Sequence, residues 1–344
     1  MAKQRIGKQT VVFSTQPSIL CGAAVAGKKE SEGPLSAYFD YTSTDTRFGQ
    51  KTWEAAERHI QQLALDLAVK KAKISNADID LIFAGDLLNQ CISSSFACRD
   101  SNIPFLGLYG ACSTMAESLC LAGMMVDAGY ADIAAAMTSS HFATAERQYR
   151  FPLNYGGQRT PTAQWTVTGA GCMLVGRNAN GPVLQAATIG TITDWGITDA
   201  NNMGAAMAPA AYASIRAHLE DRQLSPADFD LIVTGDLGQL GMEILMDLFR
   251  KDGVSIGGVC SDCGVMIFDP QRQDVHAGGS GCGCSAVVLC GYLLKKLQEK
   301  KLKQILFCGT GALLSPVSCQ QSESIPGICH VVSIGAERSK SCSI

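Results

Sequence analysis

One stretch of thirteen residues recurs in closely similar form in this chain, and the two copies lie 150 positions apart. Residues 75–87 read SNADIDLIFAGDL, and residues 225–237 read SPADFDLIVTGDL. In each copy a short polar break leads into an apolar run that predicts a buried strand, and a helix is predicted just before the break, over 52–73 and 208–223. Duplication of a helix–strand unit indicates two similar α/β halves. We place them at residues 1–180 and 181–344.

The alternation of helices and strands predicts mainly parallel sheets flanked by helices. In such sheets ligands gather at the carboxyl ends of the strands. The residues expected at or near strand ends are Asp86, Cys112, His141, Asp236, Gly281 and Thr310. We therefore predict one cleft that both halves share.

Residues 104–123, PFLGLYGACSTMAESLCLAG, are the most informative stretch within this frame. Residues 105–109 predict a buried strand, Gly110 and Ala111 allow a tight turn, and residues 112–127 predict a helix. Cys112 then lies at a helix start, where free backbone N–H groups and the helix dipole favour a thiolate or another anion. The alternative is that Cys112 packs as a small apolar residue. A similar Gly-Cys-Ser sequence at 283–285 precedes a predicted buried helix in the second half.

Charge and hydropathy exclude several classes of protein. The net charge is −3, and no basic tract is typical of a nucleic-acid-binding surface. No apolar run approaches the roughly 20 residues of a membrane helix, and the N-terminus lacks the apolar core of a signal peptide. We expect a protein that is made in the cytoplasm and has no transmembrane segment.

The chain has 15 cysteines, and many of them lie inside apolar stretches. This distribution indicates free thiols in a reducing compartment. The pairs Cys260–Cys263 and Cys282–Cys284 resemble zinc-ligand spacing. However, the second pair lies in a glycine-rich turn that leads into a helix, so we expect no metal site and no resident cofactor.

Two repeated halves with a cysteine between a strand and a helix resemble the thiolase superfamily. Residues 168–171 (TGAG), 278–281 (GGSG) and 308–312 (CGTGA) are similar to glycine-rich turns and loops of that superfamily. The resemblance implies two βαβαβαββ halves that form a layered α-β-α-β-α sandwich, and it implies a homodimer.

Within the superfamily, longer stretches resemble a family of sporulation proteins from spore-forming bacteria. These stretches are residues 32–35, 84–90, 109–114, 138–148, 203–210, 262–264, 277–282 and 310–316. The resemblance implies a protein that binds dipicolinic acid (pyridine-2,6-dicarboxylate) and supports its uptake into the developing spore. It also implies a peripheral position on the spore inner membrane, with the stage V sporulation A membrane proteins as partners.

Two other functions stay open. One is an acyl-thioester enzyme that uses Cys112 as its nucleophile with His141 or His276. Related condensing enzymes place a histidine after the strand that corresponds to 231–234, whereas this chain has Gly235-Asp236. An aspartate opposes a nearby thiolate and cannot donate to an oxyanion unless it is protonated, so we favour a non-catalytic protein. The other function is a scaffold for channel assembly that binds no ligand. The remaining histidines are predicted on helix surfaces (His59, His218) or in the C-terminal tail region (His330).

Dipicolinate is a flat ring with two carboxylates, so its site needs hydrogen-bond donors and a cation around an apolar slot. Arg147 and Arg150 are the candidate cations, on a segment that leads to a covering loop at 156–157; the alternative is a solvated helix face. Asp236 and Asp262 either contact the ligand, directly or through a calcium ion that accompanies it, or act as structural caps. The predicted ligand contacts are Cys112, Ser113, His141, Arg147, Asp236, Asp262, Ser280, Gly281 and Thr310. The long segment 28–51 is a second expected covering loop.

Overall fold

The computed structural model describes residues 4–149, 159–177 and 180–338. Within these ranges the main strands form two five-stranded arrays that are joined at the middle of the molecule. From the middle outward, the first array consists of β3 (Ser18–Ala26), β9 (Gly169–Gly176), β7 (Ile133–Ser140), β5 (Leu81–Gly85) and β6 (Phe105–Leu108). The second consists of β10 (Val183–Thr188), β15 (Gly327–Gly335), β14 (Gln304–Ala312), β11 (Leu231–Thr234) and β12 (Cys260–Asp262). The boundary that we predict after residue 180 lies between β9 and β10.

Both arrays combine parallel and antiparallel pairs in the same arrangement. β5 runs parallel to β6 and β7, as β11 does to β12 and β14. The inner pairs are antiparallel, namely β7–β9 and β9–β3 in the first array and β14–β15 and β15–β10 in the second. The expectation of mainly parallel sheets therefore holds only for the outer three strands of each array, because β9 and β15 return in the opposite direction.

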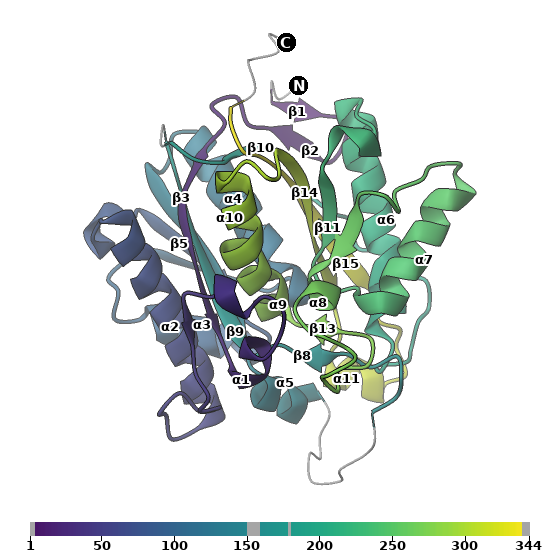
Figure 1. Ribbon diagram of the computed structural model, residues 1–344, viewed down its shortest axis with the longest axis horizontal. Coiled ribbons are helices and arrows are strands. Elements are labelled where there is room, and N and C mark those ends of the chain that lie inside the picture. Colours follow the sequence, from purple (N-terminus) through teal and green to yellow (C-terminus); the bar gives the residue numbers. More distant parts are fainter. Residues whose placement is uncertain (1–3, 150–158, 178–179, 339–344) are drawn as a thin grey trace.

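Helices form three layers around the arrays (Figure 1). Between them lie α4 (Thr114–Asp127) and α9 (Cys282–Val287), which continues through a π-helical turn (Val288–Leu293) into α10 (Leu294–Gln298). The outer face of the first array is covered by α2 (Trp53–Ala72) and α3 (Ile92–Cys98). On the second array lies α6 (Met203–Arg222), with α7 (Gly238–Lys251) packed beside it. The expected α-β-α-β-α sandwich is confirmed.

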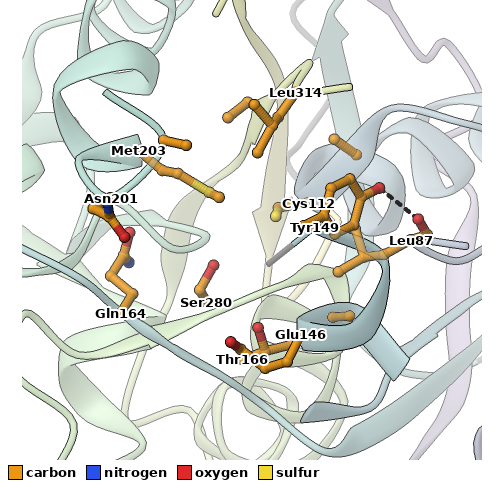
Figure 2. Close-up of a pocket in the computed structure, with 14 residues that line it drawn as sticks. Leu87, Cys112, Glu146, Tyr149, Gln164, Thr166, Asn201, Met203, Ser280 and Leu314 are labelled. Carbon is orange, nitrogen blue, oxygen red and sulfur yellow. Dashed lines mark hydrogen bonds between the residues drawn. The ribbon is translucent and has the colours of Figure 1, made fainter. Parts of the chain in front are cut away.

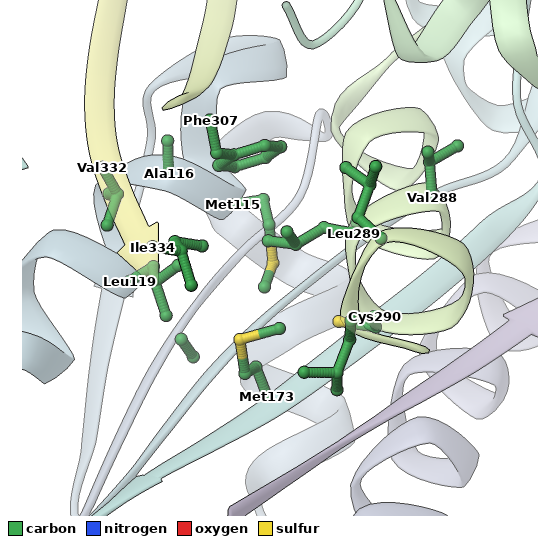
Figure 3. Packing of buried hydrophobic residues seen from close by; sticks show 14 of the residues in the cluster. Met115, Ala116, Leu119, Met173, Val288, Leu289, Cys290, Phe307, Val332 and Ile334 are labelled. Atoms are coloured by element: carbon green, nitrogen blue, oxygen red, sulfur yellow. The ribbon is translucent and has the colours of Figure 1, made fainter. Parts of the chain in front are cut away.

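The central helical layer contains the largest hydrophobic core (Figure 3). Met115 and Leu119 of α4 pack there with Leu289 of the second central helix, Phe307 of β14 and Val332 of β15, and all five are fully buried. Burial of one such side chain contributes about 1.5–3 kcal/mol. Because elements of both halves supply this core, the halves fold around a common interior.

The duplicated sequence forms the same unit twice. α2 and α6 both end at a residue in the left-handed conformation, Lys73 (φ 58°) and Gln223 (φ 54°). The polar breaks at 75–78 and 225–228 are both 3-10 turns with a reciprocal serine–aspartate capping box. Asp80 and Asp230 then each accept two backbone N–H bonds where the neighbouring strand begins. The predicted helix–turn–strand repeat is confirmed at this level of detail.

Two sequence predictions about strands are wrong. The strand predicted at 105–109 is expected to be buried, but β6 (Phe105–Leu108) lies at the edge of its array and Leu106 is 50% exposed. The glycines at 169–171 and 309–311 lie inside β9 and β14, not in loops. They are needed there because neighbouring backbone comes close: a Cβ on Gly171 would lie 2.7 Å from the carbonyl oxygen of Ala286.

Shorter elements complete the fold. They are β1 (Arg5–Ile6), β2 (Thr10–Val12), α1 (Lys28–Ser31), β4 (Tyr41–Thr42), α5 (Phe142–Tyr149), β8 (Trp165–Thr166), α8 (Cys263–Met266), β13 (Gly279–Ser280) and α11 (Pro316–Gln320). The segment 28–51, expected to be irregular, thus contains α1 and β4. Among the residues that the structure describes, none of the helices combines the length and the apolar character that crossing a membrane requires.

Candidate functional site

Cys112 lies in a tight turn between β6 and α4, as the sequence predicts. Residues 111–113 form one 3-10 turn that continues directly into α4. Ala111 has a φ of 49°, which is a strained conformation for a residue with a side chain. β14 of the second half passes close to this turn: a Cβ on Gly311 would lie 2.5 Å from the carbonyl oxygen of Gly110. The turn is therefore held between the two halves.

The Cys112 side chain is held as a protonated thiol. It is 6% exposed, and it donates a hydrogen bond to the Asp236 carboxylate. Burial, followed by the negative charge of Asp236, raises the pKa of the thiol well above its ordinary value. The thiolate that the helix start favours is therefore not the resting form, and the prediction that Asp236 opposes a thiolate is confirmed.

Asp236 connects several of the predicted site residues. Its carboxylate accepts hydrogen bonds from Thr310 Oγ1 (2.8 Å), the Gly281 backbone N–H (2.9 Å) and Ser280 Oγ (3.3 Å). Burial raises the pKa of this carboxyl to about 6, although the hydrogen bonds from Cys112, Gly281 and Thr310 act in the opposite direction. Asp236 and its partners form a buried network in contact with Cys112.

Asp262 is a structural cap. Its carboxylate accepts hydrogen bonds from the Thr234 hydroxyl (2.6 Å) and from the backbone N–H groups of Leu237 (2.8 Å), Gly238 (3.1 Å) and Val265 (3.2 Å). These bonds fix the loop after β11 and the start of α8. Of the two alternatives for this residue, the structural cap is confirmed.

A cleft opens beside Cys112 where the two halves meet (Figure 2). Most of its wall is apolar, with a few polar side chains pointing inward, as is typical of small-molecule sites. The residues that line it are Leu87, Ala111, Cys112, Ala145, Glu146, Tyr149, Gln164, Thr166, Ala200, Asn201, Met203, Ser280, Ala312 and Leu314. Within the described part of the chain, this lining contains no lysine, arginine or histidine.

Gln164 presents an unpaired acceptor in this cleft. Its Nε2 donates to the carbonyl oxygens of Asp236 (2.7 Å) and Gly279 (2.8 Å), which fixes the orientation of the amide. Its Oε1 is buried and has no hydrogen-bond partner among the described residues. A buried acceptor without a partner costs about 1–3 kcal/mol, so a donor or cation supplied by a ligand would be stabilised at this atom.

Sequence reasoning missed Gln164 and Tyr149. The contacts that orient Gln164 come from residues 72 and 115 positions away in the chain, so no local motif marks it. The Tyr149 hydroxyl donates to the Leu87 carbonyl (2.6 Å, dashed in Figure 2) and lies 2.9 Å from the Tyr109 hydroxyl. In the sequence, Tyr149 is only part of the segment that leads to the expected covering loop at 156–157.

His141, the predicted histidine of the cleft, lies outside it. Its Nε2 donates to the Thr46 carbonyl (2.8 Å), and its Nδ1 accepts from the Ala143 backbone N–H (3.1 Å). Its ring lies beside Trp53, with centroids 5.4 Å apart. The strand end predicts its position in the chain correctly, but the side chain points to another cavity.

Arg147 and Ser113 also point away from the cleft. Arg147 forms an ion pair with Glu54 of α2 and is half exposed. Of the two alternatives for Arg147, it therefore lies on a solvated helix face. Ser113 Oγ donates to the carbonyl oxygen of Gly110 (2.6 Å) within its own turn. Arg150 and the covering loop at 156–157 lie outside the described residues.

Three other histidines differ from expectation in their surroundings. His218, predicted on a surface, is fully buried because α6 is covered by the second array and by α7; its Nδ1 lies 2.8 Å from Thr188 Oγ1, and burial lowers its pKa to about 3. His330 lies in β15 and not in a tail, and burial lowers its pKa to about 4. His276 lies 3.1 Å from Asp274 and does not line the cleft. No histidine is therefore placed to activate Cys112 within the described chain.

The described cysteines, 14 in number, are all unpaired. Cys282 Sγ, for example, donates to the Ser139 carbonyl (3.0 Å). In the same part of the chain, no group of three or more histidine, cysteine or acidic side chains is arranged to hold a metal ion.

The chain has a thiolase-like fold, and solved structures with that fold match it. A single-residue variant of Xanthomonas campestris OleA is 14% identical with a TM-score of 0.60, covering 94% of this chain and 99% of that one. The 3-oxoacyl-[acyl-carrier-protein] synthase III of Aquifex aeolicus VF5 is 13% identical with a TM-score of 0.55, covering 93% and 99%. At such identities the likeness shows the fold alone.

The sequence comparisons are more specific. A family model described as stage V sporulation protein AD (SpoVAD) matches residues 7–335. The stage V sporulation protein AD of Bacillus subtilis (strain 168) is 46% identical over 326 residues, which are 95% of this chain and 96% of that protein. This chain belongs to the SpoVAD family, as the sporulation-family resemblance predicts.

Proposed function

We propose that this protein binds dipicolinate as its calcium chelate in the Cys112 cleft. Dipicolinate offers calcium one ring nitrogen and two carboxylates, and calcium takes about six to eight ligands, mostly oxygens. The one-to-one chelate therefore keeps free coordination positions for protein oxygens and water. It has no net charge, whereas the free acid is a dianion near neutral pH.

The charge of the cleft supports the chelate over the free dianion. Among the described lining residues one is acidic, Glu146, and none is cationic. Asp236 adds a second carboxylate directly behind Cys112. The observation that carries the proposal is the buried, unpaired Oε1 of Gln164, because an oxygen acceptor in a cleft whose described lining holds no cation suits a bound calcium ion and not a free carboxylate.

We also propose that the cleft does not catalyse acyl transfer. A cysteine nucleophile needs a base or a lowered pKa. Cys112 is instead a buried thiol hydrogen-bonded to a carboxylate, and no histidine of the described chain lines the cleft. Membership of the SpoVAD family supports a role in sporulation in place of condensation.

The same family membership supports the remaining parts of the proposal. The protein acts at the spore inner membrane as a peripheral component, and it delivers its ligand to the stage V sporulation A membrane proteins. It does so as a homodimer. The exposed edge strand β6 supports self-association, because unpaired strand edges add further strands readily.

Calorimetric titration tests the ligand and its site. We expect the calcium chelate to bind saturably, and dipicolinate in excess EGTA to bind to this cleft at least tenfold more weakly. Gln164→Leu should weaken chelate binding by roughly tenfold, since a calcium contact is lost. Arg147→Ala is the matched control, because its side chain pairs with Glu54 outside the cleft and binding should not change.

Two outcomes would replace this proposal. If the chelate does not bind while acetyl-coenzyme A leaves an acetyl mass on Cys112, the protein is an acyl-thioester enzyme. If neither ligand reacts or binds and membrane partners are still bound, the protein is a scaffold.

A further inference from the structure

Helix α5 forms one wall of the Cys112 cleft. Ala145, Glu146 and Tyr149 of this helix line the cleft (Figure 2). Two side chains near its C-terminal end fix the helix to the loop after β5, because the Tyr149 hydroxyl (2.6 Å) and Gln148 Nε2 (2.8 Å) both donate to the Leu87 carbonyl oxygen. The position of α5 therefore determines the shape of the cleft.

A buried carboxyl group contacts α5 nearer its other end. Glu57, on α2, is fully buried, and its Oε2 lies 2.5 Å from the Thr144 hydroxyl oxygen of α5. The same hydroxyl oxygen lies 2.9 Å from the His141 carbonyl oxygen, which can only accept. Because a hydroxyl has one proton, both hydrogen bonds form together only if Glu57 is protonated and donates to Thr144. Ser139 Oγ then donates to the other carboxyl oxygen of Glu57 (3.5 Å).

The surroundings of Glu57 favour this neutral acid. The titratable groups that face it are Asp86, in the loop after β5, and Cys282, at the start of α9, whereas β7 and α5 present the hydroxyls of Ser139 and Thr144. α3 and β9 also pack on α2, but no charge on either of them acts on Glu57. Within the described chain, none of the charges that act on Glu57 is positive. Burial, followed by the negative charge of Asp86, raises the pKa of Glu57 well above its ordinary value.

Asp86 is the ionised member of this pair of carboxyl groups. Its carboxylate accepts from the backbone N–H groups of Leu88 (2.9 Å) and Ser94 (2.8 Å) and from the Ser94 hydroxyl (2.7 Å), so all of these partners donate. Burial raises the pKa of Asp86, but these hydrogen bonds act in the opposite direction. Neighbouring carboxyl groups in different surroundings differ in pKa, so Glu57 keeps its proton next to a fixed negative charge.

We propose that Glu57 is a positioning residue for the cleft: as a neutral acid it holds α5 in place through Thr144, and its ionisation at alkaline pH releases the helix. When the proton of Glu57 passes to solvent, two buried carboxylates face each other without a cation, and they repel each other. α5 is the outer element here, because Arg147 on its other side is half exposed. Movement of α5 therefore admits water to Glu57. Only the effect on the ligand rests on the proposed function.

Hydrogen exchange of the ligand-free protein tests this tether. We expect the backbone protection of residues 142–149, corrected for the intrinsic pH dependence of exchange, to fall at least about tenfold between about pH 7 and pH 9.5, where buried glutamates can titrate. Glu57→Gln keeps a donor for Thr144 and has no proton to lose, so its protection should stay constant. Glu54→Gln is the matched control, because Glu54 also lies on α2 but pairs with Arg147 at an exposed position. This control should keep the wild-type profile.

A second variant tests the same contact if Glu57→Gln does not fold. Thr144→Val removes the hydroxyl that links α5 to Glu57 and keeps the size of the side chain. Its protection at pH 7 should already be as low as that of the wild type at pH 9.5. A wild-type protection that does not fall with pH, an equal fall in Glu57→Gln, or full protection of Thr144→Val at pH 7 would each overturn the proposal.

Calorimetry extends the test to the ligand. The lower pH limit lies above the pKa of about 6 of Asp236, the other carboxyl group near the cleft. We expect the calcium chelate to bind the wild type at least about tenfold more weakly at pH 9.5 than at pH 7, and to bind Glu57→Gln equally at both. Equal binding by the wild type at both pH values would overturn the positioning role. If no chelate binds at either pH while the exchange results hold, the proposed ligand is wrong and the tether is supported.

Discussion

The chemistry of Cys112 is determined by contacts with residues distant in the chain, although its local sequence at a helix start favours a thiolate. A helix start stabilises an anion by about 0.3–1 kcal/mol, and at most by about 2 kcal/mol. Burial and the Asp236 carboxylate both act against the thiolate, and together they raise the pKa of Cys112 well above its ordinary value. The local motif therefore predicts where the cleft lies, but the partner from the second half determines that the thiol stays protonated.

Glu30, whose carboxylate accepts a hydrogen bond from the Thr168 backbone N–H, offers a test of buried charge. It is 1% exposed, and burial raises its pKa from 4.5 to about 7. Between these values the folded chain holds a proton that the unfolded chain has released, so the free energy of unfolding falls as the pH rises through this window. The fall attributable to Glu30 is on the order of 3 kcal/mol.

We expect Glu30→Gln to flatten the loss of thermal stability between about pH 4.5 and pH 7, because the amide has no proton to release. Melting temperatures measured across this range by circular dichroism would show the change. Glu32→Gln, at an exposed position two residues away, is the control and should keep the wild-type slope. If both variants show the same slope as the wild type, the burial of Glu30 does not cause the proposed fall in the free energy of unfolding with pH.

Among the elements, β14 and the cysteine turn fit together because two residues of the strand lack side chains. A Cβ on Gly309 would lie 2.5 Å from the Ala116 Cβ, and one on Gly311 would lie 2.5 Å from the Gly110 carbonyl oxygen. Neither contact can form without movement of the turn or the strand. The glycines of this strand therefore serve close packing between the halves and not a loop.

We expect Gly311→Ala to lower the free energy of unfolding by about 1–3 kcal/mol, as overpacking of a core does. It should also weaken chelate binding, because the turn that carries Cys112 is displaced. Gly258→Ala is the matched control, since no atom lies within 4 Å of an added Cβ there. Urea unfolding and titration of both variants would give the comparison, and equal stability of the two would refute the packing argument.

The elements show which features a sequence can reveal. The helix at 53–72, its capped turn and β5 follow from residues close together in the chain, so their repeat at the second copy is predictable. The exposure of β6 and the burial of His218 depend on which elements become neighbours. Apolar content suggests a buried strand at 105–108, but only the strand order places β6 at an edge. Helical periodicity likewise cannot show that α7 covers α6.

At the scale of the whole molecule, the candidate site also depends on contacts between distant segments that local sequence patterns do not reveal. Cys112, Asp236 and Thr310, which we predict at strand ends, lie together through the hydrogen bonds of Asp236, whereas His141 of the same prediction lines another cavity. Gln164 takes its place through bonds to distant backbone. The cavity lined by Trp53 and Trp165 combines residues of five separate segments, from Lys28 to Thr168, that no spacing rule connects. Such sites emerge only when the layers are assembled.

The exposed edge of the first array predicts how two copies of the chain associate. Among the described strands β6 pairs only with β5. Exposed apolar side chains lie on β6 and on α3, which contacts it, and directly after β6: Ile92 (39% exposed), Phe96 (41%), Leu106 (50%) and Tyr109 (45%) form an apolar patch. If two β6 strands pair antiparallel across a twofold axis, each open edge is satisfied and the two patches cover each other. A charge placed on this patch would face its own copy across the axis, where like charges repel.

We therefore expect light scattering to show a dimer for the wild-type chain and a monomer for Leu106→Lys. Tyr130→Lys is the control, because Tyr130 is 75% exposed in the turn after α4 and does not belong to the patch. A circular dichroism melt of each variant establishes that the monomer is folded. A monomeric wild type would refute the homodimer, whereas a Leu106→Lys variant that stays dimeric would place the interface elsewhere on the surface.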